Sequence, residues 1–231
     1  MRMGFQDRSK QRVLIIVPAH NEAENLPVLL PEIHALGWET LVINDFSDDE
    51  TEEILKKNQY THLNLPVNVG LAAVTQMGFR YAKEHDYDVA IVVDGDGQHP
   101  PKYIHALIEA VQRGNDYVIG SRYIDKKKSF TMRMIGSRLL SFAIWVKTGR
   151  KITDPTSGMR ALGAKVLKEF SEAMNFIAEP DAVAYVLKRG YKVEEVPVQM
   201  KERMRGISYF QKPAAAIRFM YDVLISILFL Q

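Results

Sequence analysis

The feature that most constrains the fold is an alternation, along the first half of the chain, of short apolar runs with segments of helical periodicity. Runs rich in Val, Ile and Leu occur at 13–17, 40–43, 87–93 and 117–119. Strands that are buried on both faces give such runs, and helices that cross over between strands connect parallel neighbours. The sequence therefore predicts an α/β protein with a mostly parallel sheet flanked by helices.

Local signals set the boundaries of the other elements. Ser47 and Glu50 are spaced as a capping box, which predicts the start of a helix that runs to about Asn58. Pro101 suits a first helical turn and opens a helix predicted to end near Arg113. The remaining predicted elements are a short strand over 62–65 and helices over 22–36, 71–84 and 179–188.

Composition indicates an ordinary globular protein. The 231 residues are 47% apolar and 25% charged, with a net charge of +2, so one domain with a substantial core is expected. Zero Cys excludes disulfide bonds, thiolate metal ligands and a Cys nucleophile. Residues 1–12 are polar and lack the apolar stretch of a secretory signal, so we expect a cytoplasmic protein.

Basic residues are concentrated in two parts of the chain. They are Lys126, Lys127, Lys128, Arg133, Arg138, Lys147, Arg150 and Lys151 in the middle, and Lys201, Arg203, Arg205, Lys212 and Arg218 near the end. Such groups fit a solvated surface, or a surface that binds phosphate or anionic lipid. No helix-turn-helix, zinc-finger or aromatic RNA-binding signature occurs, so no nucleic acid partner is expected, and membrane phosphate is favoured.

Two carboxylates one residue apart follow the apolar run at 87–93. In an extended chain Asp94 and Asp96 lie on the same side, and the glycines beside them leave room for a cation and a phosphate. A calcium loop is excluded, because its twelfth position would be His105 where a bidentate Glu is required. A plain turn remains the alternative, and otherwise the segment predicts a divalent metal site.

Polar loops also follow the first two predicted strands. One contains Asn21 and the other contains Asp48, and each of these residues would equally suit a helix start or cap. Ligands of open parallel sheets bind at the carboxyl ends of the strands. The three loops are therefore expected to converge on one crevice.

Seven segments, in order along nearly the whole chain, resemble the inverting family 2 glycosyltransferases of the GT-A fold. The branch most similar contains dolichol-phosphate mannose synthase and bacterial polyprenyl-phosphate glycosyltransferases. The segments are 17–22 (VPAHNE), 44–48 (NDFSD), 68–70 (NVG), 94–100 (DGDGQHP), 120–122 (GSR), 154–160 (DPTSGMR) and 203–208 (RMRGIS). The resemblance implies a Rossmann-like GT-A sheet and a metal-dependent transfer of a sugar from a nucleotide-sugar donor.

The resemblance also implies roles for individual residues. On the donor side these are Pro18, His20 and Glu22 around the nucleoside, Asp45 at the base, and Asp94, Asp96 and Gln98 around Mg²⁺ or Mn²⁺. The metal would neutralise the leaving diphosphate. Arg122 and Arg138 match ligands of the acceptor phosphate, and Arg203 matches a mobile clamp on the donor phosphates, a task that suits the planar guanidinium.

The acceptor decides whether a general base is required. A lipid phosphate is largely dianionic at neutral pH and needs placement more than a base, so polyprenyl phosphate is the expected acceptor. The alternative is a hydroxyl of a lipid-linked glycan or another cell-envelope acceptor. That reaction would need a base, with Asp154 preferred over Glu179 and Asp181, which also suit a helix start.

The chain departs from the family pattern at two positions. Phe46 stands where Gly is usual in the segment around Asp45, and Met159 replaces a common Phe. The added bulk of Phe46 bears on the nucleoside pocket, so the nucleotide is not fixed by the motifs. UDP is the expected nucleotide.

The C-terminal stretch 214–230 is apolar but interrupted by Arg218 and Asp222, and is too short in its uncharged part to span a bilayer. We divide the chain into a catalytic domain, 1–212, and an amphipathic C-terminal helix, 213–231. This helix is expected either at the inner face of the membrane, with a small membrane protein as a possible partner, or in a core or homo-oligomer contact.

Overall fold

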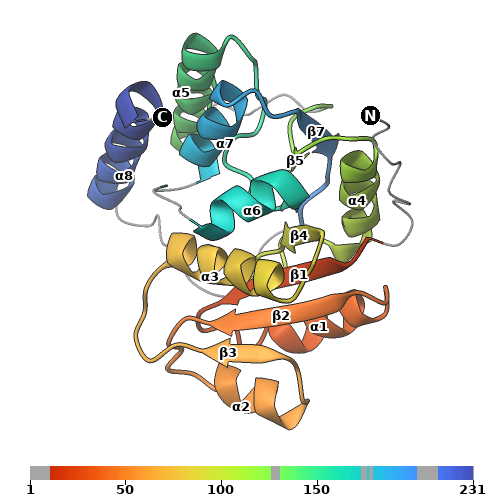
Figure 1. Ribbon diagram of the computed structural model, residues 1–231. Helices are drawn as coiled ribbons and strands as arrows, with labels where there is room; N and C mark the ends of the chain where they lie inside the picture. The colour runs from red at the N-terminus through yellow and green to blue at the C-terminus, as the bar shows by residue number, and fades with distance from the viewer. Residues whose placement is uncertain (1–10, 126–130, 173–175, 177–178, 202–212, 231) are drawn as a thin grey trace, which may run out of the picture.

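The computed structural model describes residues 11–125, 131–172, 176, 179–201 and 213–230. Within them a seven-stranded sheet lies between two layers of helices (Figure 1). The strands are β1 (Val13–Ala19), β2 (Glu39–Asn44), β3 (His62–Asn64), β4 (Val89–Val92), β5 (Tyr117–Ser121), β6 (Arg160–Gly163) and β7 (Val193–Pro197). The helices are α1 (Leu26–His34), α2 (Thr51–Lys57), α3 (Leu71–Glu84), α4 (Ile104–Gln112), α5 (Met132–Thr148), α6 (Ala164–Glu172), α7 (Glu179–Lys188) and α8 (Pro213–Ile225).

The strand order is β3-β2-β1-β4-β6-β5-β7. All neighbouring pairs are parallel except those of β6, which is antiparallel to both β4 and β5. The carboxyl ends of the parallel strands therefore share one edge of the sheet, and β6 begins at this edge. The polar loops after β1, β2, β4 and β5 thus meet the loop that precedes Arg160.

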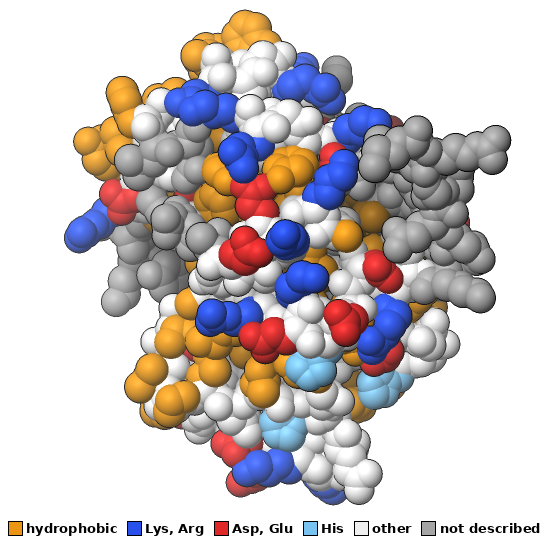
Figure 2. All heavy atoms as spheres, in the orientation of Figure 1, with side chains coloured by type: hydrophobic (Ala, Val, Ile, Leu, Met, Phe, Trp, Pro, Cys, Tyr) orange, Lys and Arg blue, Asp and Glu red, His pale blue; other side chains and the backbone are white. Residues whose placement is uncertain are grey.

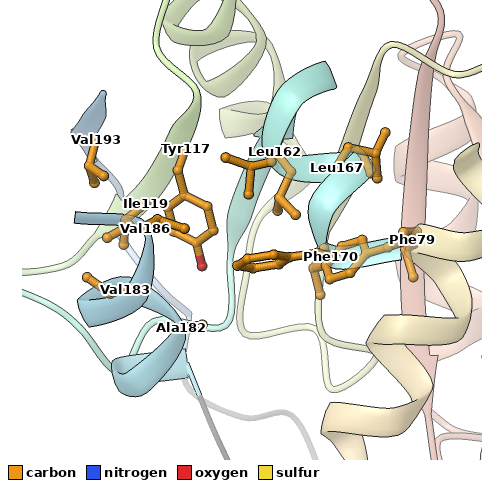
Figure 3. Close-up of a cluster of buried hydrophobic side chains, with 14 of the residues drawn as sticks. Phe79, Tyr117, Ile119, Leu162, Leu167, Phe170, Ala182, Val183, Val186 and Val193 are labelled. Carbon is orange, nitrogen blue, oxygen red and sulfur yellow. The ribbon is translucent and has the colours of Figure 1, made fainter. Parts of the chain in front are cut away.

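Alternation along the central strands builds one core on each face of the sheet. Leu14 and Ile16 of β1 face a cluster that includes residues of α3, α6 and α7, whereas Ile15 and Val17 face one that includes α1 and α4. Figure 3 shows the first cluster around the rings of its aromatic members. Tyr117, Phe79 and Phe170 are all at most 2% exposed. The sheet that carries the site is therefore rigidly packed.

Most predicted elements are confirmed, including α3 and α7 to the residue. The helix predicted from Glu22 begins only at Leu26, because the carbonyl of Glu22 accepts the N–H groups of Asn25 and Leu26 in a turn. The helix predicted from Pro101 begins with one 3-10 turn before α4. Strands β6 and β7 and helices α5 and α6 were not predicted.

The predicted capping box at Ser47 is wrong. The hydroxyl of Ser47 donates to Asn44 Oδ1 (2.5 Å) and accepts the N–H of Asn21 (2.9 Å), so it does not cap α2. Asp49 takes over at the start of α2, where its Oδ1 accepts the N–H of Thr51 (2.9 Å). The serine therefore joins two loops of the site.

The C-terminal helix packs on the rest of the fold. Val223 and the nearby Ile227 are fully buried in the same cluster as Tyr117, beside α5 and α7. The hydroxyl of Ser226 donates to Asp181 Oδ2 (2.8 Å) in α7. Within the ranges given above, no helix has both the length and the low polarity that crossing a bilayer requires. The division of the chain at residue 212 stays a prediction.

Candidate active site

The loops after β1 and β4 lie against each other because residue 95 is a glycine. Its N–H donates to the carbonyl of Pro18 (3.1 Å), and a Cβ at this position would lie 2.8 Å from the same oxygen. The carbonyl is backbone and cannot yield easily. Gly95 therefore lets the turn that carries Asp94 and Asp96 close on Pro18.

A second glycine brings the loop before β6 onto the carboxylate of Asp94. A Cβ at Gly158 would lie 2.2 Å from Asp94 Oδ2, so only glycine fits there without displacing Asp94. Asp94 is 28% exposed along its side chain, and Asp96 Oδ1 accepts the N–H of Gln98 (3.0 Å). The predicted Asp94, Asp96 and Gln98 are thus together at the end of β4.

His99 lies behind these carboxylates and was not singled out from the sequence. It is 2% exposed, and its Nδ1 is 3.4 Å from Asp94 Oδ2 without the geometry of a hydrogen bond. Burial lowers the pKa of His99 to about 4, although the negative charge of Asp96 opposes this shift. His99 is therefore neutral at pH 7.

The donor set fits a divalent cation that is shared with a substrate. Asp94 and Asp96 supply hard oxygen ligands, and the two glycine contacts leave their end of the turn open to solvent in part. Over the part of the chain that the structure describes, no group of three His, Cys, Asp or Glu is arranged to hold a metal by itself. Two carboxylates plus diphosphate oxygens is the usual arrangement for Mg²⁺.

The carboxylate of Asp45 accepts hydrogen bonds from the backbone of the neighbouring loop. Its Oδ1 accepts the N–H of Val69 (2.7 Å) and its Oδ2 accepts that of Gly70 (2.9 Å), directly before α3. The carbonyl of Asp45 contacts His20 Nδ1 (2.9 Å) and accepts from Asn68 Nδ2 (3.2 Å). The structure brings the predicted His20 and Asp45 together, and each carboxylate oxygen of Asp45 accepts one backbone N–H.

The loops after β1 and β2 interlock next to this network. Asn21 Oδ1 accepts the N–H of Asp48 (2.9 Å), and the N–H of Glu22 donates to Thr51 Oγ1 (3.0 Å). Glu22 is 7% exposed, and its Oε2 accepts from Asn25 Nδ2 (2.5 Å). The predicted Glu22 thus lies beneath the donor side of the site.

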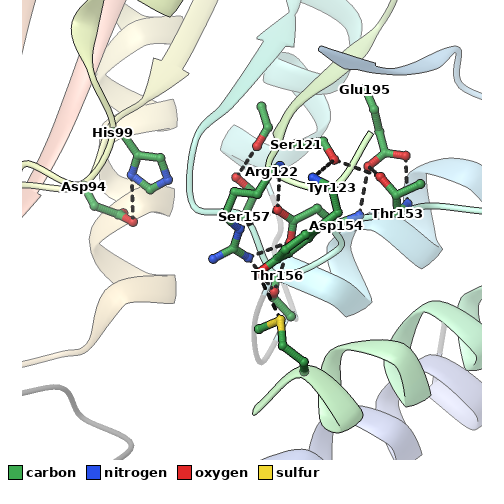
Figure 4. A network of polar contacts seen from close by, with 12 residues as sticks. Asp94, His99, Ser121, Arg122, Tyr123, Thr153, Asp154, Thr156, Ser157 and Glu195 are labelled. Atoms are coloured by element: carbon green, nitrogen blue, oxygen red, sulfur yellow. Dashed lines mark hydrogen bonds and ion pairs between the residues drawn. The ribbon is translucent and has the colours of Figure 1, made fainter. Parts of the chain in front are cut away.

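Arg122 and Asp154 form a two-pronged ion pair on the other side of the site (Figure 4). Arg122 donates from Nε to Asp154 Oδ2 and from Nη2 to Oδ1, both at 2.6 Å. Burial alone would lower the pKa of Arg122, but the hydrogen bonds and charge of Asp154 outweigh it and raise the pKa above its ordinary value. The negative charge of Asp94 also helps to raise the pKa of Arg122, and Figure 4 shows the guanidinium on the side of the pair that faces Asp94.

Asp154 is held in turn by Glu195 of β7, which sequence reasoning missed. Glu195 Oε1 accepts the N–H of Asp154 (2.9 Å) and the hydroxyl of Thr153 (2.8 Å), while its Oε2 accepts the N–H of Thr153 (2.8 Å). The sequence signal was a pair of acids, Glu194 and Glu195, between Val193 and Val196. Asp154, with no exposed surface, is thus fixed from both sides.

The other two carboxylates weighed as bases are also engaged. Glu179 Oε1 accepts from Nη2 of the buried Arg160 (3.1 Å). Asp181 is fully buried and accepts from Ser226 and from its own helix. Arg138 lies half-buried in α5, and Arg203 lies outside the described residues.

Comparisons with known proteins agree with this geometry. The model of the family described as Glycosyl transferase family 2 matches residues 14–171. Polyprenol monophosphomannose synthase of Mycolicibacterium smegmatis is 30% identical over 216 residues, with 87% of this chain and 82% of that protein covered. Dolichol-phosphate mannosyltransferase of Pyrococcus furiosus is 36% identical over 214 residues, with 85% of this chain but only 58% of that protein covered.

A solved structure gives the same fold. Glucosyl-3-phosphoglycerate synthase of Mycobacterium tuberculosis, in complex with Mn²⁺, UDP and phosphoglyceric acid, superposes with a TM-score of 0.73 at 15% identity. The superposition covers 96% of this chain and 78% of that one. The GT-A fold expected from the sequence is therefore confirmed.

Proposed function

Since the chain belongs to glycosyl transferase family 2, we propose that it transfers a sugar from a nucleoside diphosphate donor to polyprenyl phosphate, with inversion at the anomeric carbon. The resemblance seen in the sequence is confirmed, and the chain is a glycosyltransferase. Its two relatives above are named as a polyprenol monophosphomannose synthase and a dolichol-phosphate mannosyltransferase. These names support the acceptor class of the proposal.

The observation that carries the proposal is the placement of Arg122. Its guanidinium is fixed by both oxygens of the buried Asp154 and faces the carboxylates at the end of β4. A cation that is held rigidly opposite a metal site is suited to position an anionic nucleophile against a metal-bound donor. Arg122 supplies this cation, and Asp154 acts as its positioning residue.

Asp94 and Asp96, with Gln98 beside them, would hold the metal. A bound Mg²⁺ or Mn²⁺ supplies charge that stabilises the departing nucleoside diphosphate. Asp96 is kept in place by the N–H of Gln98, and Asp94 is confined by Gly158. These contacts orient the two carboxylates before the donor binds.

The state of the three candidate bases favours a phosphate acceptor over a hydroxyl. Asp154 is paired with Arg122, Glu179 is paired with Arg160, and Asp181 accepts from a hydroxyl and a backbone N–H. A carboxylate whose oxygens are engaged by fixed hydrogen-bonding partners is not directed at an acceptor hydroxyl. A phosphate dianion needs no proton acceptor, so polyprenyl phosphate is preferred to the hydroxyl of a lipid-linked glycan.

The exposed face of helix α5 supports a peripheral position of the protein at an anionic membrane. The active site would then lie at the cytosolic face of that membrane. The helix begins at Thr131, whose hydroxyl accepts the N–H of Met134, and it ends at the left-handed Gly149. One face of α5 carries four apolar residues at helical spacing that are each 46–58% exposed. They are Ile135, Leu139, Phe142 and Val146, with Trp145 at 50% beside them.

An exposed apolar face of this size on a soluble domain marks an interaction surface, and its charged neighbours suit lipid. Arg138 lies three residues after Ile135 and four before Phe142, so it borders the apolar face and suits a lipid phosphate. Arg150 and Lys151 are exposed just beyond the helix. A small membrane protein or a second copy of the chain would be an additional partner of this face.

The nucleotide of the donor is part of the proposal. UDP remains our expectation, and the solved structural neighbour is a complex with UDP and Mn²⁺, although its 15% identity carries only the fold. The relatives are named for mannose transfer. A donor panel must therefore include GDP-mannose beside UDP-sugars and dTDP-sugars.

The experiment measures transfer of labelled sugar from this panel into an organic-extractable polyprenyl phosphate, with Mg²⁺ or Mn²⁺ and then with chelator. Metal-dependent label in the lipid fraction is the expected result and names the donor. Label that appears only in a hydroxyl acceptor would move the function to the glycan-extending class. Transfer that is unaffected by chelator would remove the metal from the proposal.

A further inference from the structure

Phe46 has a conformation that packing does not explain. Its φ is 56°, in the left-handed region that a bulky side chain rarely adopts, and it is 53% exposed. The ring therefore gains little from the core in return for a disfavoured backbone. Residues held in such conformations are concentrated at functional sites.

The backbone on both sides of Phe46 is fixed by hydrogen bonds. The N–H of Asp45 donates to the carbonyl of Ala19 (2.8 Å), and the N–H of Ser47 donates to Asn44 Oδ1 (3.2 Å). The loop consequently holds the backbone of Phe46 in one place, and the exposed ring projects from this fixed point. Its position does not depend on contacts of the ring itself.

The sheet order places Phe46 where a nucleoside would lie. Strand β1 separates β2 from β4, so the end of β2 is two strand spacings, roughly 10 Å, from the end of β4 that carries Asp94. Arg122 lies on the β5 and β6 side of Asp94, so a donor whose diphosphate is near Asp94 and Asp96 would extend its ribose and base the other way, across β1. The loop that follows β2 is the next surface that the base meets.

Each carboxylate oxygen of Asp45 already accepts one backbone N–H group, which leaves one lone pair on each oxygen for a base. Apolar surface is available as well. Val67, Val69 and Leu71 are 58%, 38% and 43% exposed, and Figure 2 shows hydrophobic side chains gathered over the loop that joins β3 to α3. Bases bind such surfaces by stacking on an aromatic ring.

We propose that the ring of Phe46 stacks on the nucleobase of the donor and provides most of the base's binding energy. The inference rests on the proposed function and adds a stacking contact to the base recognition expected of Asp45. Stacking reads the face of a base and not its hydrogen-bonding edge. Removal of the ring should therefore weaken UDP and GDP binding by similar factors.

The test measures the Kd of UDP and of GDP by calorimetry in Mg²⁺, for the wild type, Phe46→Gly and Phe46→Tyr. Phe46→Gly should raise the Kd of whichever nucleotides bind by about 5- to 100-fold, the range expected for stacking of one base. Its Tm should be at least that of the wild type, because glycine tolerates the left-handed backbone. Phe46→Tyr keeps the ring and should bind within about twofold of the wild type.

Gln59→Gly is the matched control. Gln59 has a φ of 55° and is exposed at the end of α2, so its replacement relieves the same kind of backbone conformation away from the site. This variant should keep the wild-type Kd. If Phe46→Gly binds UDP and GDP with the same Kd values as the wild type, the stacking contact is overturned and the transferase proposal stands. A wild type that binds no nucleoside diphosphate would overturn both.

Discussion

The carboxylate of Asp154 holds the guanidinium of Arg122 through two hydrogen bonds of 2.6 Å, although the residues are 32 positions apart. Asp154 also accepts the N–H of Arg122 (3.0 Å), so side chain and backbone are fixed together. Glu195 fixes the other side of Asp154. The proposed acceptor side of the site is thus preorganised by a buried acid.

Asp154→Asn should lower both stability and acceptor use. Removing one partner of a buried ion pair typically costs about 3 kcal/mol, and the loosened Arg122 should lower kcat/KM for polyprenyl phosphate at least tenfold. Urea unfolding and transfer kinetics measure the two effects. Arg122→Lys keeps the positive charge but not the planar guanidinium that makes two hydrogen bonds. It should therefore lower kcat/KM for polyprenyl phosphate as well, with a smaller loss of stability than Asp154→Asn. A wild-type KM for the lipid in Asp154→Asn would contradict the positioning role.

Asp96→Asn should abolish metal-dependent transfer while Tm stays within about 2 °C of the wild type. Electron paramagnetic resonance of Mn²⁺ titrated with nucleotide measures the metal site directly. Asp86→Asn is the matched control, because Asp86 is exposed before the opposite end of β4, in a left-handed conformation that Asn accepts. A fully active Asp96→Asn would remove Asp96 from the metal site.

Gly158→Ala should displace Asp94 with little effect elsewhere. The added Cβ would be 2.2 Å from Asp94 Oδ2, so we expect weaker Mn²⁺ binding and at least tenfold slower transfer. Gly163→Ala, at the far end of β6, meets nothing closer than Val111 Cγ1 at 3.3 Å and the carbonyl oxygen of Asn115 at 3.4 Å, and serves as the control. Equal metal affinities in the two variants would contradict the coupling of residue 158 to Asp94.

Phe142→Ser should reduce binding to anionic vesicles without loss of stability. Phe142 is 57% exposed, so the folded state loses little, whereas the lipid contact should weaken about tenfold. Cosedimentation with phosphatidylglycerol vesicles measures this. Val28→Ser removes a side chain of similar exposure (46%) on α1 and should bind as the wild type does. Undiminished binding of Phe142→Ser would place the membrane surface elsewhere.

Tyr87 predicts how stability changes at alkaline pH. Burial and a hydrogen bond to Glu39 raise the pKa of Tyr87 to about 12, against the attraction of Arg12. The unfolded phenol, with an ordinary pKa near 10, loses its proton first. The stability that Tyr87 contributes is therefore complete below about pH 10 and lost as pH rises to about 12. Between about pH 10 and pH 12 the urea midpoint of the wild type should fall more than that of Tyr87→Phe. If the two midpoints change in parallel with pH, the ionisation of Tyr87 does not contribute to stability.

The first half of the sheet was predictable because β1, β2 and β4 are nearly uninterrupted apolar runs. Strand β6 was missed, since its four residues begin with Arg160 and end with Gly163, which gives no strand pattern. Helix α5 was missed for a different reason. Its apolar residues lie on both its buried and its exposed faces, so Leu140 and Phe142 do not form a simple amphipathic period.

The convergence of the loops was predictable, but the pairing within the site was not. The contact of Arg122 with Asp154 depends on the antiparallel β6, and the role of Glu195 depends on β7. The capping-box pattern also assigned Ser47 to the start of α2, because such a pattern takes no account of a competing hydrogen-bond partner such as Asn44. Contacts between distant segments are set by sheet order, which a single sequence does not encode locally.

The position of β6 in the sheet also affects the order in which the strands can pair during synthesis on the ribosome. Among the described strands, β4 and β5 are joined only through β6, which is synthesised after both. A nascent chain that has emerged through Ser121 can pair β1, β2, β3 and β4 but leaves β5 without its neighbour. The strands that carry the proposed donor loops can thus pair before those that carry Arg122 and Glu195, and the site becomes complete only when β6 and β7 have been synthesised.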